Sequence, residues 1–458
     1  MKIAILGAAG VRTPLIVEAI ARRQERLNLE DLALMDIDGQ RLDLIGALTR
    51  PLEKTAGLKF HLTRTTDVVQ ALQGADFVIT TFRVGGIASR VIDERVPLSH
   101  GVLGQETTGP GGFAMGMRTI PVILETVEQL RTYCPDAWLI NFANPAGMLA
   151  EAVAQTGWKR VVGICDAPTG MQRVAAAVLG APVEEIFLDY FGLNHLGWVR
   201  SVLFHGQDVL PKFLQMAQQA GELPDLPFQL DFIAALGMIP NEYLYYYYHA
   251  DQAVKNILQA GRTRGEQIAK LNEELFASLK SCQEVGDQAG MLAAYRAYLQ
   301  QRGQTYMAAE TGKGRNQAAH GPFAAAVAAA LSGEGYAGVA LDLIEGLQGQ
   351  AARSMILNIP NQGALPGMGA GDVVEVPALV SRDLVRPLAA GEVPAACLGL
   401  MQQVKAYEQA TIRAAREHSY SLAVQALVLH PLVRDYNLAR RILDGYIEQH
   451  AENFPALD

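Results

Sequence analysis

The sequence predicts an α/β fold in two parts, a mostly parallel sheet with helices over residues 1–170 and an α+β part over residues 171–458. Two observations predict the first part: short apolar runs alternate with helical patterns, and small-residue turns follow the runs. Strands separated by helices in this way form right-handed crossovers in a parallel sheet. The second part is predicted by a change of pattern, to two strands in tandem and then to long helical stretches.

Composition limits the class of protein. The chain has 458 residues, 50% hydrophobic and 19% charged, which suits a globular protein with a large core. Its net charge of −9 argues against nucleic-acid binding, and no apolar run reaches the ~18 residues of a membrane span. The sequence starts with a strand pattern rather than a signal peptide, and its four cysteines lie far apart, so we expect a cytosolic protein without disulfides.

The first elements are a strand over residues 2–6, the turn Gly7-Ala-Ala-Gly10 and a helix to about residue 23. Small residues let the backbone of such a turn approach a pyrophosphate, whose charge the helix N-terminus attracts. A second strand over residues 32–36 ends in Asp36, close to where an acid binds the ribose hydroxyls of a dinucleotide. The turn is not a full G-x-G-x-x-G, so an ordinary α/β turn is the alternative to a Rossmann-like NAD site.

The rest of the chain continues both patterns. A turn at Ala143-Asn144-Pro145 ends one strand, and His205-Gly-Gln-Asp208 joins two others as a hairpin. Further strands are expected at residues 76–81, 138–142, 161–165, 186–191, 198–204, 355–359 and 373–376. Helices are expected over residues 262–300 and 398–450, the second of them broken near Pro431.

A thiol and a carboxylate, Cys165 and Asp166, stand at the carboxyl end of the strand over residues 161–165. Open α/β sheets bind ligands at that end of their strands. His195 follows on a segment between two glycines, and it could hold one metal ion together with Cys165. The alternative is that Cys165 is a buried apolar residue and His195 a hydrogen-bonded core histidine.

Three other segments carry residue types that suit a site. Residues 101–113 hold five glycines and a proline, and long loops of this kind are usually functional, although a mobile surface loop is the alternative. Arg83, Arg90 and Arg95 lie near a strand end, where one could bind a phosphate while the others are solvated. The tyrosine run from Tyr243 is either a packed aromatic cluster or the source of a general base.

Five motifs make the chain resemble glycoside hydrolase family 4, whose members use NAD and a divalent metal ion, and most of all its 6-phospho-β-glucosidases. The motifs are Gly104-Gln-Glu-Thr-Thr-Gly-Pro-Gly-Gly-Phe113, Asn141-Phe-Ala-Asn-Pro145, Gly163-Ile-Cys-Asp-Ala-Pro168, Gly192-Leu-Asn-His195 and Pro240-Asn-Glu-Tyr-Leu244. The resemblance runs from the Gly7 turn to the helical C-terminus. It implies a lactate/malate-dehydrogenase-like second domain and a homodimer or homotetramer.

The resemblance also implies roles for individual residues. Cys165 and His195 would be the metal ligands, normally of Mn²⁺, with Tyr243 as catalytic base and Asp166 as candidate general acid. Arg90 would bind the sugar 6-phosphate, with further substrate contacts from Asn144, Asn194 and Arg264. The NAD contacts would be Gly7, Gly10, Val11, Arg12, Asp36 and Asn144. The turn after Gly7 departs from the family, because many members have further glycines and a serine there.

By this resemblance the chain would hydrolyse 6-phospho-β-glucosides, such as phosphorylated disaccharides or aryl 6-phosphoglucosides, to glucose 6-phosphate. The reaction would oxidise C3, remove the C2 proton, eliminate the aglycone from C1, add water and reverse the redox steps. Asp166 is more usual in α-specific members, so a 6-phospho-α-glucosidase is the alternative. The rivals from other classes are an NAD-dependent hydroxy-acid dehydrogenase and a nucleotide sensor without catalysis.

Overall fold

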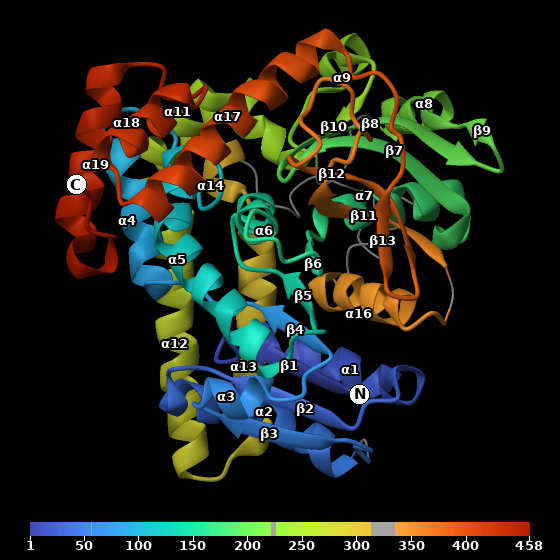
Figure 1. Ribbon diagram of the computed structural model, residues 1–458, viewed down its shortest axis with the longest axis vertical. Helices are drawn as coiled ribbons and strands as arrows, with labels where there is room; N and C mark the ends of the chain where they lie inside the picture. Colours follow the sequence, from blue (N-terminus) through green and yellow to red (C-terminus); the bar gives the residue numbers. More distant parts are fainter. Residues whose placement is uncertain (56, 221–225, 313–334, 351) are drawn as a thin grey trace.

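The structure is a computed structural model that describes residues 1–55, 57–220, 226–312, 335–350 and 352–458. The strands of these ranges form one sheet of 13 strands, in the order β10-β8-β7-β12-β11-β6-β5-β4-β1-β2-β3, with β9 paired to β8 and β13 to β12. Figure 1 shows the sheet running through the molecule from the blue N-terminal strands to the green hairpin of β7 and β8. The predicted α/β fold followed by an α+β part is confirmed.

The first six strands are parallel and follow the order 3-2-1-4-5-6 of a dinucleotide-binding sheet. They are β1 (Lys2–Leu6), β2 (Asp31–Met35), β3 (His61–Thr65), β4 (Phe77–Thr80), β5 (Trp138–Asn141) and β6 (Val161–Gly163). β4 and β5 are buried along their whole length, so they read as continuous apolar runs. The sequence does not predict β3, because this edge strand is only half-buried and has a polar composition.

The helices of this half are α1 (Thr13–Leu27), α2 (Gly39–Thr55), α3 (Val68–Leu72), α4 (Gly86–Ser99), α5 (Pro110–Tyr133), α6 (Ala146–Ala154) and α7 (Ala167–Leu179). The glycine-rich loop is shorter than predicted, because Pro110 starts α5. A Cβ atom on Gly111 or Gly112 would lie 2.0 or 2.3 Å from the carbonyl oxygen of Gln105 or Thr107. These glycines therefore let the loop pack directly on the first turn of the helix.

The later strands are antiparallel to their neighbours in the sheet. They are β7 (Ile186–Leu193), β8 (Leu196–Phe204), β9 (Gln207–Asp208), β10 (Ile239–Pro240), β11 (Arg353–Pro360), β12 (Val373–Ser381) and β13 (Leu384–Pro387). β11 pairs with β6 at Asn358 and Gly163, and β12 pairs with β7 at Glu375 and Gly192. The sheet therefore continues across the predicted domain boundary at residue 170, which stays a prediction.

The second half also supplies most of the helices on the side of the molecule that carries the C-terminus (Figure 1). They are α8 (Leu210–Ala220), α9 (Leu230–Leu236), α10 (Tyr245–Tyr248), α11 (Ala250–Ala260), α12 (Arg264–Glu284), α13 (Gln288–Gln304), α14 (Ala308–Thr311), α16 (Gly335–Leu347), α17 (Ala395–Glu417), α18 (Tyr420–Leu429) and α19 (Tyr436–His450), with short 3₁₀ turns at Val183–Glu185, Glu242–Leu244 and Ala451–Asn453. The helical stretch over residues 398–450 has one more break than predicted, because His418 ends α17 in a left-handed conformation.

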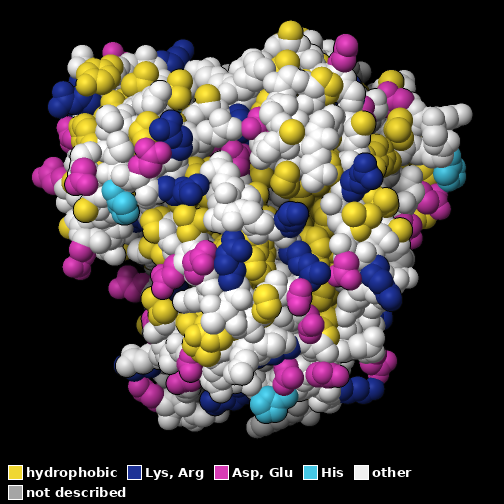
Figure 2. Space-filling view, in the orientation of Figure 1, with side chains coloured by type: hydrophobic (Ala, Val, Ile, Leu, Met, Phe, Trp, Pro, Cys, Tyr) yellow, Lys and Arg dark blue, Asp and Glu magenta, His cyan; other side chains and the backbone are white. Residues whose placement is uncertain are grey.

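Three properties of the described residues bear on the predicted class of protein. None of their helices is long and apolar enough to cross a membrane. The four cysteines are free thiols, as their spacing predicts. Figure 2 shows acidic and basic side chains intermixed over the face seen in Figure 1, rather than gathered in one basic stripe.

The helices α12 and α13 form a hairpin that packs on α2 and on the turn after β1. The Tyr295 hydroxyl of α13 donates a hydrogen bond to the carbonyl oxygen of Val11 at 2.7 Å. One turn further on, the Tyr298 hydroxyl donates to Asn272 of α12 and accepts from Arg302, both at 2.7 Å. One rigid hairpin therefore holds the glycine turn and also carries Arg302.

Candidate active site

A cavity of about 1420 Å³ opens at the carboxyl ends of the parallel strands. Its lining includes the residues that follow β1, β2, β4, β5 and β6, which is the edge where open α/β sheets bind ligands. The second half of the chain closes it with side chains from the segment around Tyr243 and from the α12–α13 hairpin. Both halves therefore contribute to one site.

The glycine turn forms one end of the cavity. Gly7 has a φ of +94°, and a Cβ atom there would lie 2.4 Å from the backbone nitrogen of Phe82, so only glycine fits. The N–H of Ala9 donates to the Asp36 carboxylate at 2.9 Å, which ties the turn to the end of β2. The structure brings the predicted NAD contacts together, because the cavity is lined by Gly7, Gly10, Val11, Arg12 and Asp36.

The two predicted metal ligands meet beside the predicted base. Cys165 Sγ lies 3.5 Å from His195 Nε2, although 30 positions separate them in the sequence. His195 stands in the two-residue connection between β7 and β8 with a φ of +63°, which is uncommon for a residue other than glycine. The Tyr243 ring stacks on its imidazole, with ring centres 3.7 Å apart and planes within 5°. The Tyr243 hydroxyl also accepts a hydrogen bond from Tyr306 at 3.1 Å.

Burial is the main cause of the pKa shifts of Cys165, His195 and Tyr243. It raises the pKa of the Cys165 thiol well above its usual value, and the charge of Glu375 raises it further. It lowers the pKa of His195 to about 4. It also raises the pKa of the Tyr243 hydroxyl, with an added contribution from Tyr306. All three side chains are therefore uncharged near pH 7, and a nearby cation would favour the anionic forms of the thiol and the phenol.

The donor set fits a divalent metal ion. In zinc sites a thiolate sulfur binds at about 2.3 Å and an imidazole nitrogen at about 2.0 Å, so at a tetrahedral angle the two atoms are about 3.5 Å apart. The Sγ–Nε2 distance of 3.5 Å between Cys165 and His195 matches this value. Within the ranges that the structure describes, no third His, Cys, Asp or Glu completes a cluster with them. Such a pair leaves coordination positions open, as catalytic metal sites do.

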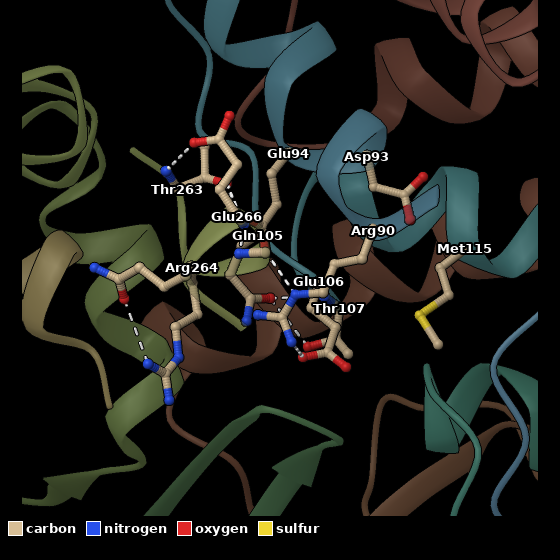
Figure 3. Close-up of polar contacts among 12 residues, drawn as sticks. Arg90, Asp93, Glu94, Gln105, Glu106, Thr107, Met115, Thr263, Arg264 and Glu266 are labelled. Atoms are coloured by element: carbon tan, nitrogen blue, oxygen red, sulfur yellow. Dashed lines mark hydrogen bonds and ion pairs between the residues drawn. The ribbon is translucent and has the colours of Figure 1, made fainter. Parts of the chain in front are cut away.

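The wall beside the glycine-rich loop is a network of ion pairs (Figure 3). Arg90 donates from Nε to Glu94 at 2.8 Å, and its Nη1 lies 2.5 Å from Glu106. Arg83 pairs with the same carboxylate of Glu106. Burial acts to raise the pKa of Glu106, but the charges of Arg83 and Arg90 hold that pKa well below its usual range. The protein itself therefore balances the charge of Arg90, whose predicted contact with a phosphate stays a prediction.

The adjoining wall, where the N–H of Gly265 at the start of α12 donates to Glu94 at 2.6 Å, carries two arginines of the α12–α13 hairpin. Arg264 donates to the Thr305 hydroxyl and, at 2.6 Å, to the carbonyl oxygen of Arg302. Arg302 donates to the Tyr298 hydroxyl. Within the described residues, both guanidinium groups therefore donate to uncharged acceptors. Burial and the charge of Arg302 lower the pKa of Arg264 to about 10. Arg264 is buried and Arg302 half-buried, and a pair of like charges without a bonded carboxylate is suited to binding an anion.

The remaining predicted residues are divided between the cavity and the protein interior. Asp166 and Asn144 are half-buried and line the cavity. Asn194 lies behind the wall, where its amide donates to Glu375 at 3.3 Å. The same buried carboxylate accepts from the Tyr190 hydroxyl at 2.6 Å. The structure therefore places Asn194 in a network behind the Cys–His pair, and its predicted substrate contact stays a prediction.

Among the cavity residues to which the sequence assigns no role are Glu106, Thr107, Arg302 and Tyr306. Glu106 and Thr107 belong to the glycine-rich motif, whose ordinary composition of Glu and Thr does not show which side chain faces the site. Arg302 and Tyr306 lie at and beyond the end of α13, outside any motif, and only the packing of the hairpin brings them to the cavity.

A dinucleotide-type sheet with a cavity at its carboxyl edge and a Cys–His pair under a stacked tyrosine defines a Rossmann-type enzyme. Residues 2–181 match the family model described as Family 4 glycosyl hydrolase, and residues 190–433 match the model of the C-terminal domain of that family. The chain therefore belongs to family 4 of the glycosyl hydrolases.

Three relatives show how far the similarity extends. A probable 6-phospho-β-glucosidase of Bacillus subtilis is 32% identical over 99% of this chain and 97% of its own length. The structure of a 6-phospho-β-glucosidase of Thermotoga maritima with manganese, NAD⁺ and glucose 6-phosphate superposes with a TM-score of 0.82 at 27% identity, covering 100% of both chains. A 6-phospho-α-glucosidase from gut microorganisms, in complex with NAD and Mn²⁺, gives a TM-score of 0.84 at 27% identity, covering 100% of this chain and 99% of the other.

Proposed function

We propose that this chain hydrolyses 6-phospho-β-glucosides to glucose 6-phosphate and an aglycone, with NAD and Mn²⁺ as cofactors. The observation that carries the proposal is the stacking of Tyr243 on His195, 3.7 Å between ring centres, next to the Cys165 thiol. This arrangement puts a candidate base, which lines the cavity that also reaches the glycine turn, directly over a candidate metal ligand pair. Relatives that bind NAD, manganese and glucose 6-phosphate support the same assignment.

The hairpin arginines are the proposed anchors of the 6-phosphate. Arg264 and Arg302 face the cavity, and in the described residues their hydrogen bonds go to uncharged acceptors. A phosphate dianion would offset the mutual repulsion that lowers the pKa of Arg264. The contacts of Arg90 with Glu94 and Glu106 use its Nε and Nη1 atoms. Its Nη2 group can therefore donate a further hydrogen bond to the phosphate from the other wall.

In the proposed reaction, the chemistry that the bound cofactors would supply is reversible hydride transfer at C3 of the sugar and polarisation of the C3 oxygen. Tyr243, ionised when a cation lies beside it, removes the proton from C2. Asp166, which also lines the cavity, gives a proton to the oxygen that leaves C1. Addition of water at C1, return of a proton to C2 and return of the hydride to C3 complete the hydrolysis. The ion pairs of Glu106 keep the wall of the cavity fixed while these protons move.

The anomer is the finer part of the proposal. The motif Thr107-Thr-Gly-Pro-Gly-Gly-Phe113 and the motif around Tyr243 favour the β-specific group, as does the B. subtilis relative. Asp166 favours the α-specific alternative, because a carboxylate after the cysteine is more usual there. A homodimer or homotetramer and a cytosolic location stay predictions.

The test is release of p-nitrophenol from p-nitrophenyl 6-phospho-β-glucoside and from its α anomer. Each assay contains NAD⁺, Mn²⁺ and thiol, and each component is omitted in turn. Release from the β anomer that disappears without NAD⁺ or Mn²⁺, and about 10³-fold less release by Tyr243→Phe, is the expected result. Release from the α anomer alone would replace the β assignment. Inactivity on both, with net NADH formed from a 2-hydroxy acid, would return the chain to the dehydrogenases.

A further inference from the structure

The side of His195 that faces away from Cys165 has a hydrogen-bond partner. Thr107 Oγ1 of the glycine-rich loop lies 2.7 Å from His195 Nδ1, while Nε2 faces the Cys165 sulfur. Thr107 and His195 are 88 positions apart in the sequence, so this contact depends on the packing of the loop. Thr107 is also held at its backbone, because its N–H donates to the Gln105 side chain at 2.7 Å.

The direction of this hydrogen bond follows from the neighbours of Thr107. A threonine hydroxyl has one proton to donate, and Thr107 Oγ1 lies 3.1 Å from the amide oxygen Oε1 of Gln105. Oε1 can only accept, so the hydroxyl proton points to Gln105. Thr107 Oγ1 then presents its lone pairs to His195, and the hydrogen bond requires a proton on Nδ1. A neutral imidazole with a proton on Nδ1 has its free lone pair on Nε2.

We propose that Thr107 is a positioning residue that holds the His195 proton on Nδ1, so that Nε2 is free to bind the metal ion beside Cys165. The metal part of this inference rests on the proposed function, whereas the position of the proton does not. Partners of this kind typically change metal affinity by about 10- to 100-fold when they are removed, because they fix the orientation and the tautomer of the ligand. The loop thereby serves the site with two adjacent residues: Glu106 holds the arginines, and Thr107 holds the histidine.

The first experiment reads the tautomer without any metal. Protein labelled with ¹⁵N in its histidine rings gives nitrogen shifts that distinguish a protonated Nδ1 from a protonated Nε2, and His195→Asn assigns the signal. We expect the wild type to show His195 protonated on Nδ1. We expect Thr107→Val, which replaces the hydroxyl by a methyl group, to show a mixture of tautomers, and Thr107→Ser to restore the wild-type pattern. A wild-type signal from protonated Nε2 would overturn the inference.

The second experiment measures the dissociation constant of Mn²⁺ by calorimetry, with NAD⁺ present. We expect about 10- to 100-fold weaker binding by Thr107→Val and a change of less than about 3-fold for Thr107→Ser. Thr108→Val is the matched control, since it removes the neighbouring hydroxyl, for which the structure gives no bond to His195. Thr107→Ala replaces Thr107→Val if that variant does not fold.

The two experiments separate failure of the inference from failure of the proposed function. Equal Mn²⁺ affinity for Thr107→Val and the wild type would overturn the role of Thr107 while the metal site stands. Wild-type protein that binds no Mn²⁺, although its tautomer is as expected, would overturn the metal site and leave Thr107 as the residue that sets the His195 tautomer.

Discussion

The two cationic walls of the cavity contain similar residues in opposite electrostatic situations. Arg90 on α4 is bonded to Glu94 and faces Glu106, so its charge is balanced inside the protein. Arg264 and Arg302 on the hairpin donate to hydroxyl and carbonyl oxygens, so their charges are not balanced by a bonded carboxylate in the described residues. An arginine of the first kind stabilises the fold, and arginines of the second kind are available to a ligand.

The largest effect is expected on the balanced wall. Arg90→Ala leaves two carboxylates, Glu94 and Glu106, with less compensation in a buried site, and we expect the free energy of unfolding to fall by about 3–5 kcal/mol. Urea unfolding measures it. Arg95→Ala on the same helix is the matched control, because the Arg95 side chain is 39% exposed and its pair with Glu266 is worth at most about 1 kcal/mol. Equal losses for the two variants would remove the distinction between the walls.

On the hairpin wall the effect should appear in binding. Arg264→Ala removes a charged donor from the proposed phosphate site, so we expect kcat/KM for the phosphorylated substrate to fall about 100-fold, mostly through KM. The exposed neighbour Arg262 gives the control variant Arg262→Ala, which should keep both constants. An unchanged KM for Arg264→Ala, together with a raised KM for Arg90→Lys, would assign the phosphate to the other wall.

The buried, uncharged side chain of His430 gives a third case to compare with the charged arginines of the two walls. His430 stacks near Tyr247 and Tyr407, and burial lowers its pKa to about 3. In the unfolded chain the imidazole of His430 has a pKa near 6.5, so below that pH the unfolded state binds a proton that the folded state does not. The free energy of unfolding therefore decreases as the pH falls from 6.5 toward 3. Between pH 7.5 and 5.0 we expect the wild type to lose about 2 kcal/mol more than His430→Asn in urea unfolding. Parallel pH curves would show that the fold does not lower the pKa of His430.

The smallest effects are expected from the hydroxyl groups of Tyr295 and Tyr298 on α13, each of which should change a different binding constant. Tyr295→Phe removes the bond to Val11 in the glycine turn, worth about 1 kcal/mol, and should raise the Kd of NAD⁺ about 5-fold while leaving the substrate KM unchanged. Tyr298→Phe removes the acceptor of Arg302 and should instead raise the substrate KM. Fluorescence titration and steady-state kinetics measure the two constants. Both variants changing the same constant would contradict separate roles.

The parts of the fold that the sequence predicts well are those where one local pattern decides the outcome. The strands β1, β4 and β5 are apolar because both faces of the sheet are covered, and the Gly7 turn needs glycine for steric reasons. The edge strand β3 and the early start of α5 at Pro110 depend on tertiary packing, and no apolar period marks them.

The same limit applies to the site. The motifs around Cys165, His195 and Tyr243 predict residues that the structure brings within contact distance. Arg90 and Arg264 look alike in the sequence, and only the structure shows that one has carboxylate partners and the other uncharged acceptors. Whether a charge is balanced depends on contacts such as that between Arg90 and Glu106, which no short motif records.

The bond from Tyr295 to Val11 restricts how this enzyme can be redesigned or can diverge. Because α13 ends near Arg302 and touches the glycine turn through Tyr295, a shift of that helix to admit a larger anion at the proposed phosphate site would also displace the glycine turn. A change of the anion bound by the hairpin should therefore be accompanied by changes in the glycine turn.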